Sequence, residues 1–172
     1  TIPTNLMALE PLPQLSDLVI QKAITIRQPY ATALALGLKK YETRKWFTDY
    51  DGWIAIHSGK NTDSLSLSQE LIGIDEFQLP LGAIVAVAKF KCFKISGSDI
   101  KAISDRERRL GFWYERNYAW KVTDLVQCNP VEVLGTRGLW FVHHSLEQRI
   151  KNAIYEHYRH GNQSHRPIAS RV

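Results

Sequence analysis

Apolar and polar positions in the first half of the chain follow two different periods. After Pro29, a residue suited to the first turn of a helix, apolar residues recur at helical spacing and predict a buried stripe. The positions of this stripe are Ala31, Leu34, Ala35 and Leu38. Short runs rich in β-branched and aromatic residues predict strands at 22–26, 41–46 and 53–57. The polar stretch 61–78 carries scattered leucines and isoleucines, which indicates a second helix with ragged ends.

The second half of the chain begins with the longest predicted strand, residues 83–95, whose length favours a bulge or bend. Residues 98–117 have a mainly helical pattern. Further strands are predicted at 118–126, 131–133 and 138–142, and the first two are separated by the turn signal Asn129-Pro130. Short strands interrupted by helices, with turn residues about every eight to twelve positions, indicate an α+β barrel rather than a doubly wound sheet.

The chain divides by composition into four segments. Residues 1–20 form a leader punctuated by prolines, and residues 21–145 carry the strand and helix pattern of one domain. An apolar stripe that follows Ser145, a residue type favoured at helix caps, predicts a C-terminal helix over 146–160. Residues 161–172 are polar and basic, so we expect a disordered tail. The sequence leaves the oligomeric state open.

Several features of the sequence favour a cytoplasmic location. No apolar run is long enough to cross a bilayer, and the N-terminal residues lack the charged-then-apolar pattern of a secretion signal. Two cysteines, Cys92 and Cys128, are too few for a disulfide framework. We therefore expect a soluble cytoplasmic protein that makes no contact with a membrane.

The charge of the chain narrows the class of partner. The formal net charge is +5 at pH 7, which favours polyanions through ion pairing and counterion release. A segment that combines cations with aromatic rings lies between Arg106 and Arg116 and includes Phe112 and Trp113. It either extends a path for RNA or forms a solvated helix face with its aromatic residues packed inward. The sequence leaves both interpretations open.

The most informative stretch is residues 37–44, Gly-Leu-Lys-Lys-Tyr-Glu-Thr-Arg. On a strand, side chains alternate between faces, so Glu42 and Arg44 point to the same side and Trp46 follows them. Lys39 lies at the junction with the preceding helix, close enough to join them. Because an isolated buried charge is costly, such a group is either a satisfied salt-bridge cluster or a ligand site.

This stretch resembles the signature of the ASCH domain family, Gly-x-Lys-x-x-Glu-x-Arg, and fills every position of it. Residues 24–31 are similar to the family's strand followed by Gln-Pro-Tyr-Ala, and residues 52–58 to its Ile-His-Ala/Ser strand. Residues 82–87, 118–120 and 135–140 resemble its later strands in the right order. The resemblance implies a PUA-like small mixed β-barrel with flanking helices. It places the signature residues in a cleft beside the first helix.

Family members are proposed to bind RNA or to act on nucleotides, so the resemblance implies an RNA- or nucleotide-binding module. The signature carries Lys39, Glu42 and Arg44 into the cleft. Weaker candidates for its walls come from the neighbouring matches and from the strand position of Trp46. They are Gln28, Trp46, His57, Ser58, Trp120 and Arg137.

Two alternatives to simple binding stay open. The first is a hydrolase acting on RNA or a modified nucleoside, with Lys39 and Glu42 as an acid–base pair on a water molecule. One branch of the family hydrolyses N4-acetylcytidine with a lysine and a threonine three residues later. Here Glu42 occupies that threonine position, and Thr43 faces the other side of the strand. The second alternative is a protein-interaction domain, because the family is also linked to transcription coactivators.

No metal or cofactor is predicted. His157, His160 and His165 lie near the C-terminus, but no cysteine or carboxylate completes a convincing ligand set with them. A phosphate-binding loop and a dinucleotide fingerprint are both missing from the sequence.

Overall fold

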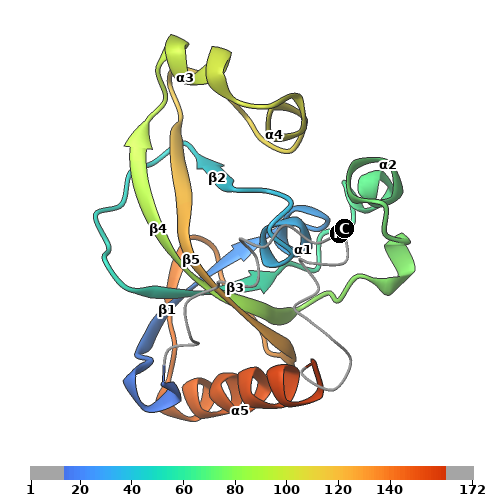
Figure 1. Ribbon diagram of the computed structural model, residues 1–172, viewed down its shortest axis with the longest axis vertical. Coiled ribbons are helices and arrows are strands. Elements are labelled where there is room, and N and C mark those ends of the chain that lie inside the picture. Colours follow the sequence, from blue (N-terminus) through green and yellow to red (C-terminus); the bar gives the residue numbers. More distant parts are fainter. Residues whose placement is uncertain (1–13, 162–172) are drawn as a thin grey trace.

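The computed structural model describes residues 14–161, which form a mixed α+β structure around one curved sheet (Figure 1). The sheet has six strands in the order β2-β5-β4-β3-β1-β6, and all neighbours are antiparallel except β1 and β3. The strands are β1 Ile20–Ile26, β2 Tyr41–Arg44, β3 Trp53–Ser58, β4 Ala83–Lys94, β5 Tyr118–Glu132 and β6 Leu139–Phe141. The predicted leader and tail fall largely on residues 1–13 and 162–172, which lie outside the described range.

Helices lie at the two ends of the sheet and beside it (Figure 1). α5 packs at one end, α3 and α4 form a cap at the opposite end, and α1 and α2 lie to one side. The helices are α1 Tyr30–Ala35, α2 Ser68–Ile72, α3 Gly97–Ala102, α4 Asp105–Arg109 and α5 His144–Gly161. Short 3-10 turns are η2 Leu15–Asp17, η3 Leu65–Leu67 and η4 Glu76–Gln78. No helix in this range is long and apolar enough to span a membrane.

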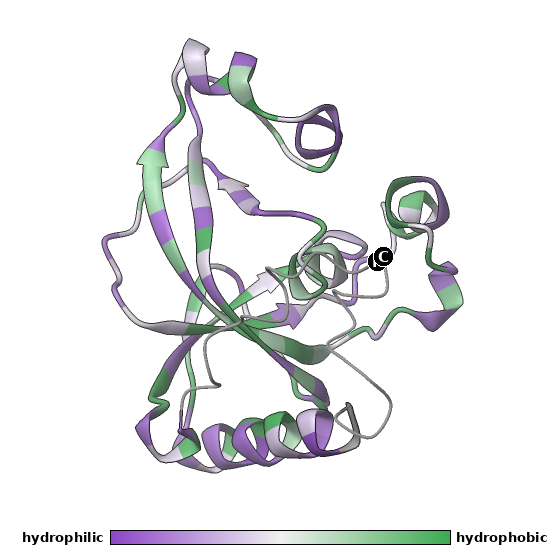
Figure 2. Cartoon of the chain, in the orientation of Figure 1, coloured by the Kyte–Doolittle hydropathy of each residue, from purple (hydrophilic) through white to green (hydrophobic). Residues whose placement is uncertain are grey.

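The C-terminal helix α5 forms as predicted and closes one part of the core. Leu146, Ile150 and Ile154 recur every fourth residue, so they lie on one face of α5 and are buried against β4 and β5. Figure 2 shows the hydrophobic positions of α5 turned toward the sheet and the polar ones turned away. Each side chain of this size contributes about 1.5–3 kcal/mol when fully buried. The helix is therefore held mainly by its packing on the sheet.

A second apolar cluster fills the space between α1 and the sheet. It joins Ile24 of β1, Leu34 of α1, Ile56 of β3 and Trp120 of β5, all of which are inaccessible to solvent. Three positions of the helical stripe predicted after Pro29, Ala31, Leu34 and Ala35, lie on the face of α1 that packs here, whereas Leu38 follows the helix and packs against a separate cluster. The cluster between α1 and the sheet supports the strand β2 and the residues around it.

The sheet does not close into the predicted barrel. β2 pairs only with β5, and it forms one edge of the sheet while β6 forms the other. Pairing of β2 with β1 would close the sheet. This pairing is blocked because β1 already pairs with β3 along one edge and with β6 along the other. The PUA-like small mixed β-barrel expected from the sequence is therefore not confirmed, whereas the α+β class is confirmed.

Several element boundaries also differ from the prediction. Residues 61–78 form 3-10 turns and the five-residue α2 rather than one helix, and residues 98–117 form two short helices followed by an irregular segment. The strands predicted at 118–126 and 131–133 are one strand, β5. Pro130 fits within it because it lies where the β4–β5 register shifts, so its missing N–H interrupts no regular ladder bond. β1 begins at Ile20, and Leu18 before it is fully buried.

Candidate functional site

The turn after α1 places the signature residues. Gly37 adopts a left-handed conformation with φ 74°, which costs glycine little, and it ends the helix. The backbone N–H groups of Leu38 and Lys39 both donate to the carbonyl of Ala33, at 2.9 and 3.1 Å. The chain then enters β2 directly. Lys39 thus leaves the helix with its side chain directed inward, and β2 carries the rest of the signature.

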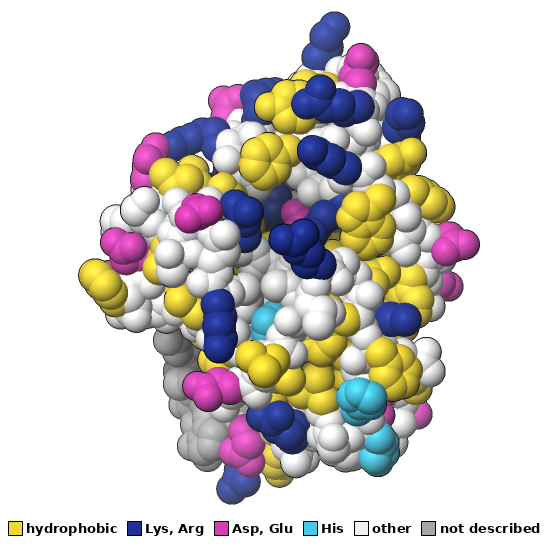
Figure 3. All heavy atoms as spheres, turned by 180° about the vertical axis from the view of Figure 1, so that it is seen from behind, with side chains coloured by type: hydrophobic (Ala, Val, Ile, Leu, Met, Phe, Trp, Pro, Cys, Tyr) yellow, Lys and Arg dark blue, Asp and Glu magenta, His cyan; other side chains and the backbone are white. Residues whose placement is uncertain are grey.

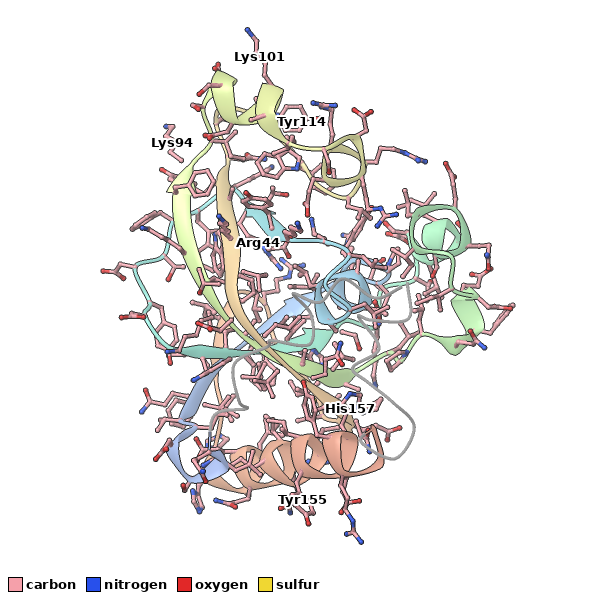
Figure 4. The ribbon with its side chains drawn as sticks, in the orientation of Figure 1. Arg44, Lys94, Lys101, Tyr114, Tyr155 and His157 are labelled. Atoms are coloured by element: carbon pink, nitrogen blue, oxygen red, sulfur yellow. The ribbon has the colours of Figure 1, made fainter. Side chains whose placement is uncertain are left out.

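Glu42 and Arg44 lie on the same face of β2, as strand alternation predicted. Nη2 of Arg44 is 3.2 Å from Oε2 of Glu42, and it also donates to the carbonyl oxygen of Thr25 at 2.8 Å. Oε1 of Glu42 accepts from the backbone N–H of Thr43 at 2.8 Å. Figure 4 shows Arg44 in the space between β2 and the end of β1. A side chain therefore spans the gap between two strands that share no backbone ladder.

We call this gap, lined by Lys39, Glu42, Arg44 and Trp120, the seam. The Arg44 side chain is 24% exposed and the Glu42 side chain 9%, so the pair is largely buried but open to one side. Figure 3 shows a hollow on the face opposite to that of Figure 1, with basic side chains around it and an acidic side chain at its floor.

Lys39 is buried, yet its ammonium group does not join the Glu42–Arg44 pair. Nζ donates to the carbonyl of Leu110 and lies 5.9 Å from the centre of the Tyr30 ring. Within residues 14–161, no carboxylate comes within ion-pair distance of it. Burial lowers the pKa of Lys39, and the more distant charges of Glu42 and Glu107 oppose this effect only in part. The structure brings the three signature side chains together but leaves the amine without an ion-pair partner.

Thr43 faces away from the seam. Its hydroxyl oxygen accepts a hydrogen bond from the backbone N–H of Phe112 at 2.9 Å, which fastens β2 to the segment after α4. The expectation that Thr43 and Glu42 lie on opposite faces is confirmed.

Trp120 adds an unused donor to the seam. It is paired with Glu42 in the β2–β5 register, so both side chains lie on one face of the sheet. The ring is fully buried, and among the described residues its indole N–H has no hydrogen-bond acceptor. Trp46, which is 36% exposed, packs edge-on against this ring with centroids 4.8 Å apart. A buried donor without an acceptor costs about 1–3 kcal/mol, which an oxygen of a ligand would offset.

Gln28 and Ser58 are engaged within the protein. The amide of Gln28 donates to Thr32 Oγ1 and to the carbonyl of Pro80, at 2.7 and 2.9 Å, and its oxygen accepts from the Thr32 N–H. The hydroxyl of Ser58 donates to the carbonyl of Ala83 at 3.0 Å and accepts from the N–H of the same residue. Both side chains are fully buried, and their hydrogen bonds hold loops to the sheet.

His57 belongs to a separate network. Its Nε2 lies 2.7 Å from the carbonyl of Val133 and acts as the donor there, so Nδ1 is left to accept from Thr25 Oγ1 at 3.1 Å. The indole of Trp140 donates to the same hydroxyl oxygen at 3.1 Å. Burial lowers the pKa of His57.

Arg137 lies exposed in the loop before β6, and no contact within the described range joins it to the seam.

Sequence reasoning missed three groups that shape the site, namely Thr25, Leu110 and Glu107. Oε1 of Glu107 accepts from the backbone N–H of Lys40, and Oε2 is buried without a partner among the described residues. Burial raises the pKa of this carboxyl group. The spacing of Ser104 and Glu107 is typical of a helix cap, and such residues are usually exposed, so no signal in the sequence indicated a buried acid.

In the segment between Arg106 and Arg116, the inward packing of the aromatic residues is confirmed for Trp113 but not for Phe112. Phe112 is 61% exposed, whereas Trp113 is buried and donates to the carbonyl of Glu107 at 3.0 Å. Arg109 pairs with Glu70 of α2.

For metals, no cluster of three suitable side chains occurs within residues 14–161, and His157 contacts Gln127 and Asn129 instead.

Comparison with known proteins agrees with this architecture. The structure of ASCH from Zymomonas mobilis superposes with a TM-score of 0.52 at 13% identity, covering 76% of this chain and 93% of that one. Two mutant structures of the same protein give TM-scores of 0.48 at 12% and 13% identity. No curated protein sequence matches the chain. A sequence model of the ASCH domain matches residues 24–133, which is more than half of the chain, and the chain therefore belongs to the ASCH domain family.

Proposed function

We propose that this ASCH domain binds RNA and takes one nucleotide, with its base splayed out of the strand, into the seam. The observation that carries the proposal is a buried donor without an acceptor, together with a buried amine without a carboxylate partner, near the Glu42–Arg44 pair. The Trp120 indole N–H has no acceptor within the described part of the chain, and the Lys39 amine has no carboxylate partner there. Folding has already buried these donors, so a ligand oxygen that reaches them gains more than it would at an exposed surface.

Each group in the seam has a chemical counterpart in a nucleotide. Lys39 and Arg44 donate to phosphate or carbonyl oxygens, and Glu42 accepts from the amino edge of a base or from a ribose hydroxyl. The partly exposed ring of Trp46 offers a surface on which a base can stack. The net charge of +5 supports an anionic partner as large as RNA.

Titration of labelled single-stranded and structured RNA at several salt concentrations tests this proposal. We expect saturable binding whose log–log slope against salt rises by roughly 0.7 to 0.9 for each phosphate neutralised. Glu42→Gln keeps the size of the side chain but removes its charge. We expect Glu42→Gln and Arg44→Lys, tested as separate single variants, each to weaken RNA binding. Arg149→Lys, on the exposed face of α5, is the matched control and should bind like the wild type. The absence of saturable binding at low salt would rule the proposal out.

A second function is favoured by one specific observation, the environment of Lys39. Burial lowers the pKa of the Lys39 amine, which makes its neutral form more accessible than in an ordinary lysine, and the neutral form can accept a proton from water. In a hydrolase acting on an N-acylated nucleoside, water would give a proton to Lys39 as its oxygen bonds to the acyl carbon. The C–N bond to the base would then break, and the departing amine would take that proton back from Lys39. Glu42 is held by Arg44 rather than by Lys39, so it orients the substrate and does not share the proton.

Turnover of acylated nucleosides and RNA decides between binding and hydrolysis. Lys39→Met should abolish turnover, while Glu42→Gln should raise KM more than it lowers kcat. Activity that survives in Lys39→Met would exclude the seam as its source.

A further inference from the structure

A second concave site lies behind β2, on the face opposite the seam. A pocket of about 530 Å³ is found here. It lies between the α3–α4 cap and the face of the sheet that carries Tyr41. We call it the outer pocket. Its principal lining residues are Lys40, Tyr41, Phe93, Arg106, Glu107 and Trp113.

The walls of the outer pocket suit a flat heterocycle. Tyr41 lies edge-on to Trp113 and to Phe93, with ring centroids 5.2 and 6.3 Å apart. Glu107 also lines the pocket, is 5% exposed, and has an Oε2 atom without a partner in the described range. Aromatic walls beside an unused acceptor match a nucleobase that carries an exocyclic amino group.

A pair of lysines lies next to these walls on the same face of the sheet. Lys91 of β4 is directly opposite Lys121 of β5, and Lys121 is opposite Tyr41 of β2. Both lysines are exposed, and neither forms an ion pair with any residue between 14 and 161. Like charges directly opposite each other are unfavourable in a β ladder. A bound anion would relieve this repulsion.

We propose that the outer pocket binds a nucleotide, with the base against the aromatic walls and the phosphate on Lys91 and Lys121. The amino edge of the base would donate to Glu107. The nucleotide is either free or a unit of an RNA strand, and in the second case the inference rests on the proposed function of the seam. β2 is an edge strand, so a polynucleotide can pass around its free edge from the seam to the outer pocket.

Two indole N–H signals in a nitrogen–proton NMR spectrum report on the two sites separately. Trp113 lines the outer pocket and Trp120 lies in the seam, and Trp113→Phe and Trp120→Phe variants assign their signals among the five tryptophans of the chain. We expect RNA to shift both signals. A nucleoside monophosphate that shifts Trp113 alone identifies free nucleotide as the source. A shift of Trp120 alone at saturating RNA would overturn the outer pocket and leave the seam proposal intact, whereas a shift of Trp113 alone with RNA would do the reverse.

A charge-matched pair of double variants tests the phosphate contacts. Lys91→Ala/Lys121→Ala should abolish the Trp113 shift and lower the salt slope for RNA by about 1.4, since each phosphate contact to a single strand contributes about 0.7. Lys22→Ala/Lys89→Ala removes the same charge from lysines that stack over Phe141 and Trp53, and it should keep the wild-type slope. Equal slopes for the two double variants would overturn the proposal.

Glu107→Gln tests how the base is read. Glutamine keeps an oxygen that can accept from the Lys40 N–H, but it replaces one carboxylate oxygen with a donor. We expect the wild type to prefer adenine or cytosine nucleotides over uridine nucleotides and the variant to lose this preference. The same preference in both proteins, at unchanged unfolding midpoints, would contradict the role of Glu107.

Discussion

Arg44 and Thr25 are joined by one hydrogen bond, from Nη2 to the carbonyl oxygen at 2.8 Å, and this bond links β2 to β1. The two strands share no backbone ladder, so the guanidinium group takes the place of a strand pairing. Because the same nitrogen also contacts Glu42, one side chain satisfies a buried carboxylate and a partly buried carbonyl.

Removing the Arg44 side chain should therefore cost stability. Arg44→Ala leaves Glu42 and the Thr25 carbonyl without this donor, and we expect the free energy of unfolding to fall by about 1–3 kcal/mol. Arg44→Lys should cost less, because its ammonium group can still reach one of the two acceptors. Urea unfolding measures the change. Arg149→Ala also removes a bond to a backbone carbonyl, that of Glu132, but at an exposed position, so a loss within about 0.5 kcal/mol is expected. Equal losses for Arg44 and Arg149 would contradict the buried role.

The buried amine of Lys39 should make stability depend on pH. Its pKa is lowered in the folded state, so between that value and the ordinary value near 10.5 the unfolded chain binds more protons. Stability therefore rises with pH across this window, by at most about 1.4 kcal/mol for each pH unit. Lys39→Met removes the titrating group. In urea unfolding at a series of pH values from 7 to 10, the free energy of unfolding of the wild type should increase relative to that of the variant as pH rises. Parallel pH curves for the two proteins would disprove the effect.

His57 should make stability rise with pH as well, but in the acid range. Burial lowers its pKa, and Lys60 lowers it further, so the folded state favours the neutral ring. As pH falls below the ordinary value of about 6.5, the unfolded chain takes up a proton that the folded chain resists, and stability decreases. His57→Gln should lose less stability than the wild type between pH 7 and pH 5. The pKa of His157 is also lowered, but this residue is present in both proteins and cancels in the comparison. A difference that does not change with pH would refute the assignment.

Gly135 should tolerate no side chain. A Cβ atom there would lie 2.5 Å from the His57 ring and 2.7 Å from Thr25 Oγ1, so Gly135→Ala should lower the free energy of unfolding by about 1–3 kcal/mol. Gly59 is a matched control, because a Cβ there would meet a methyl group of Thr25 at 3.3 Å and the carbonyl oxygen of Ile26 at 3.8 Å, which are much looser contacts. Thermal unfolding should give a smaller loss for Gly59→Ala. A smaller loss at Gly135 than at Gly59 would mean that the loop moves away freely.

Strand alternation and local spacing predicted a large part of this structure. The pairing of Glu42 with Arg44, the opposite direction of Thr43 and the helix α5 all depend on neighbours within a few residues. The bond from Lys39 to the Leu110 carbonyl joins residues 71 positions apart, and no local pattern encodes it.

The open sheet could not be predicted for a similar reason. The approximate positions of the strands are local properties, but closure depends on which edges of β1 are already occupied. That is decided by the pairing of β1 with β3 and β6, two segments far apart in the chain. Pro130 was misleading because a turn signal and a bulge in a long strand favour the same residue.

The register of β2 against β5 has a consequence for how this domain can vary. Trp120 and Lys121 are consecutive residues on β5, and they supply opposite faces of the sheet. A shift of one residue between these strands would exchange the faces, so the acid and arginine of the signature would point at the α3–α4 cap and Thr43 would point inward. A single inserted or deleted residue in this four-residue strand would therefore change the chemistry of both faces while leaving composition and charge almost untouched.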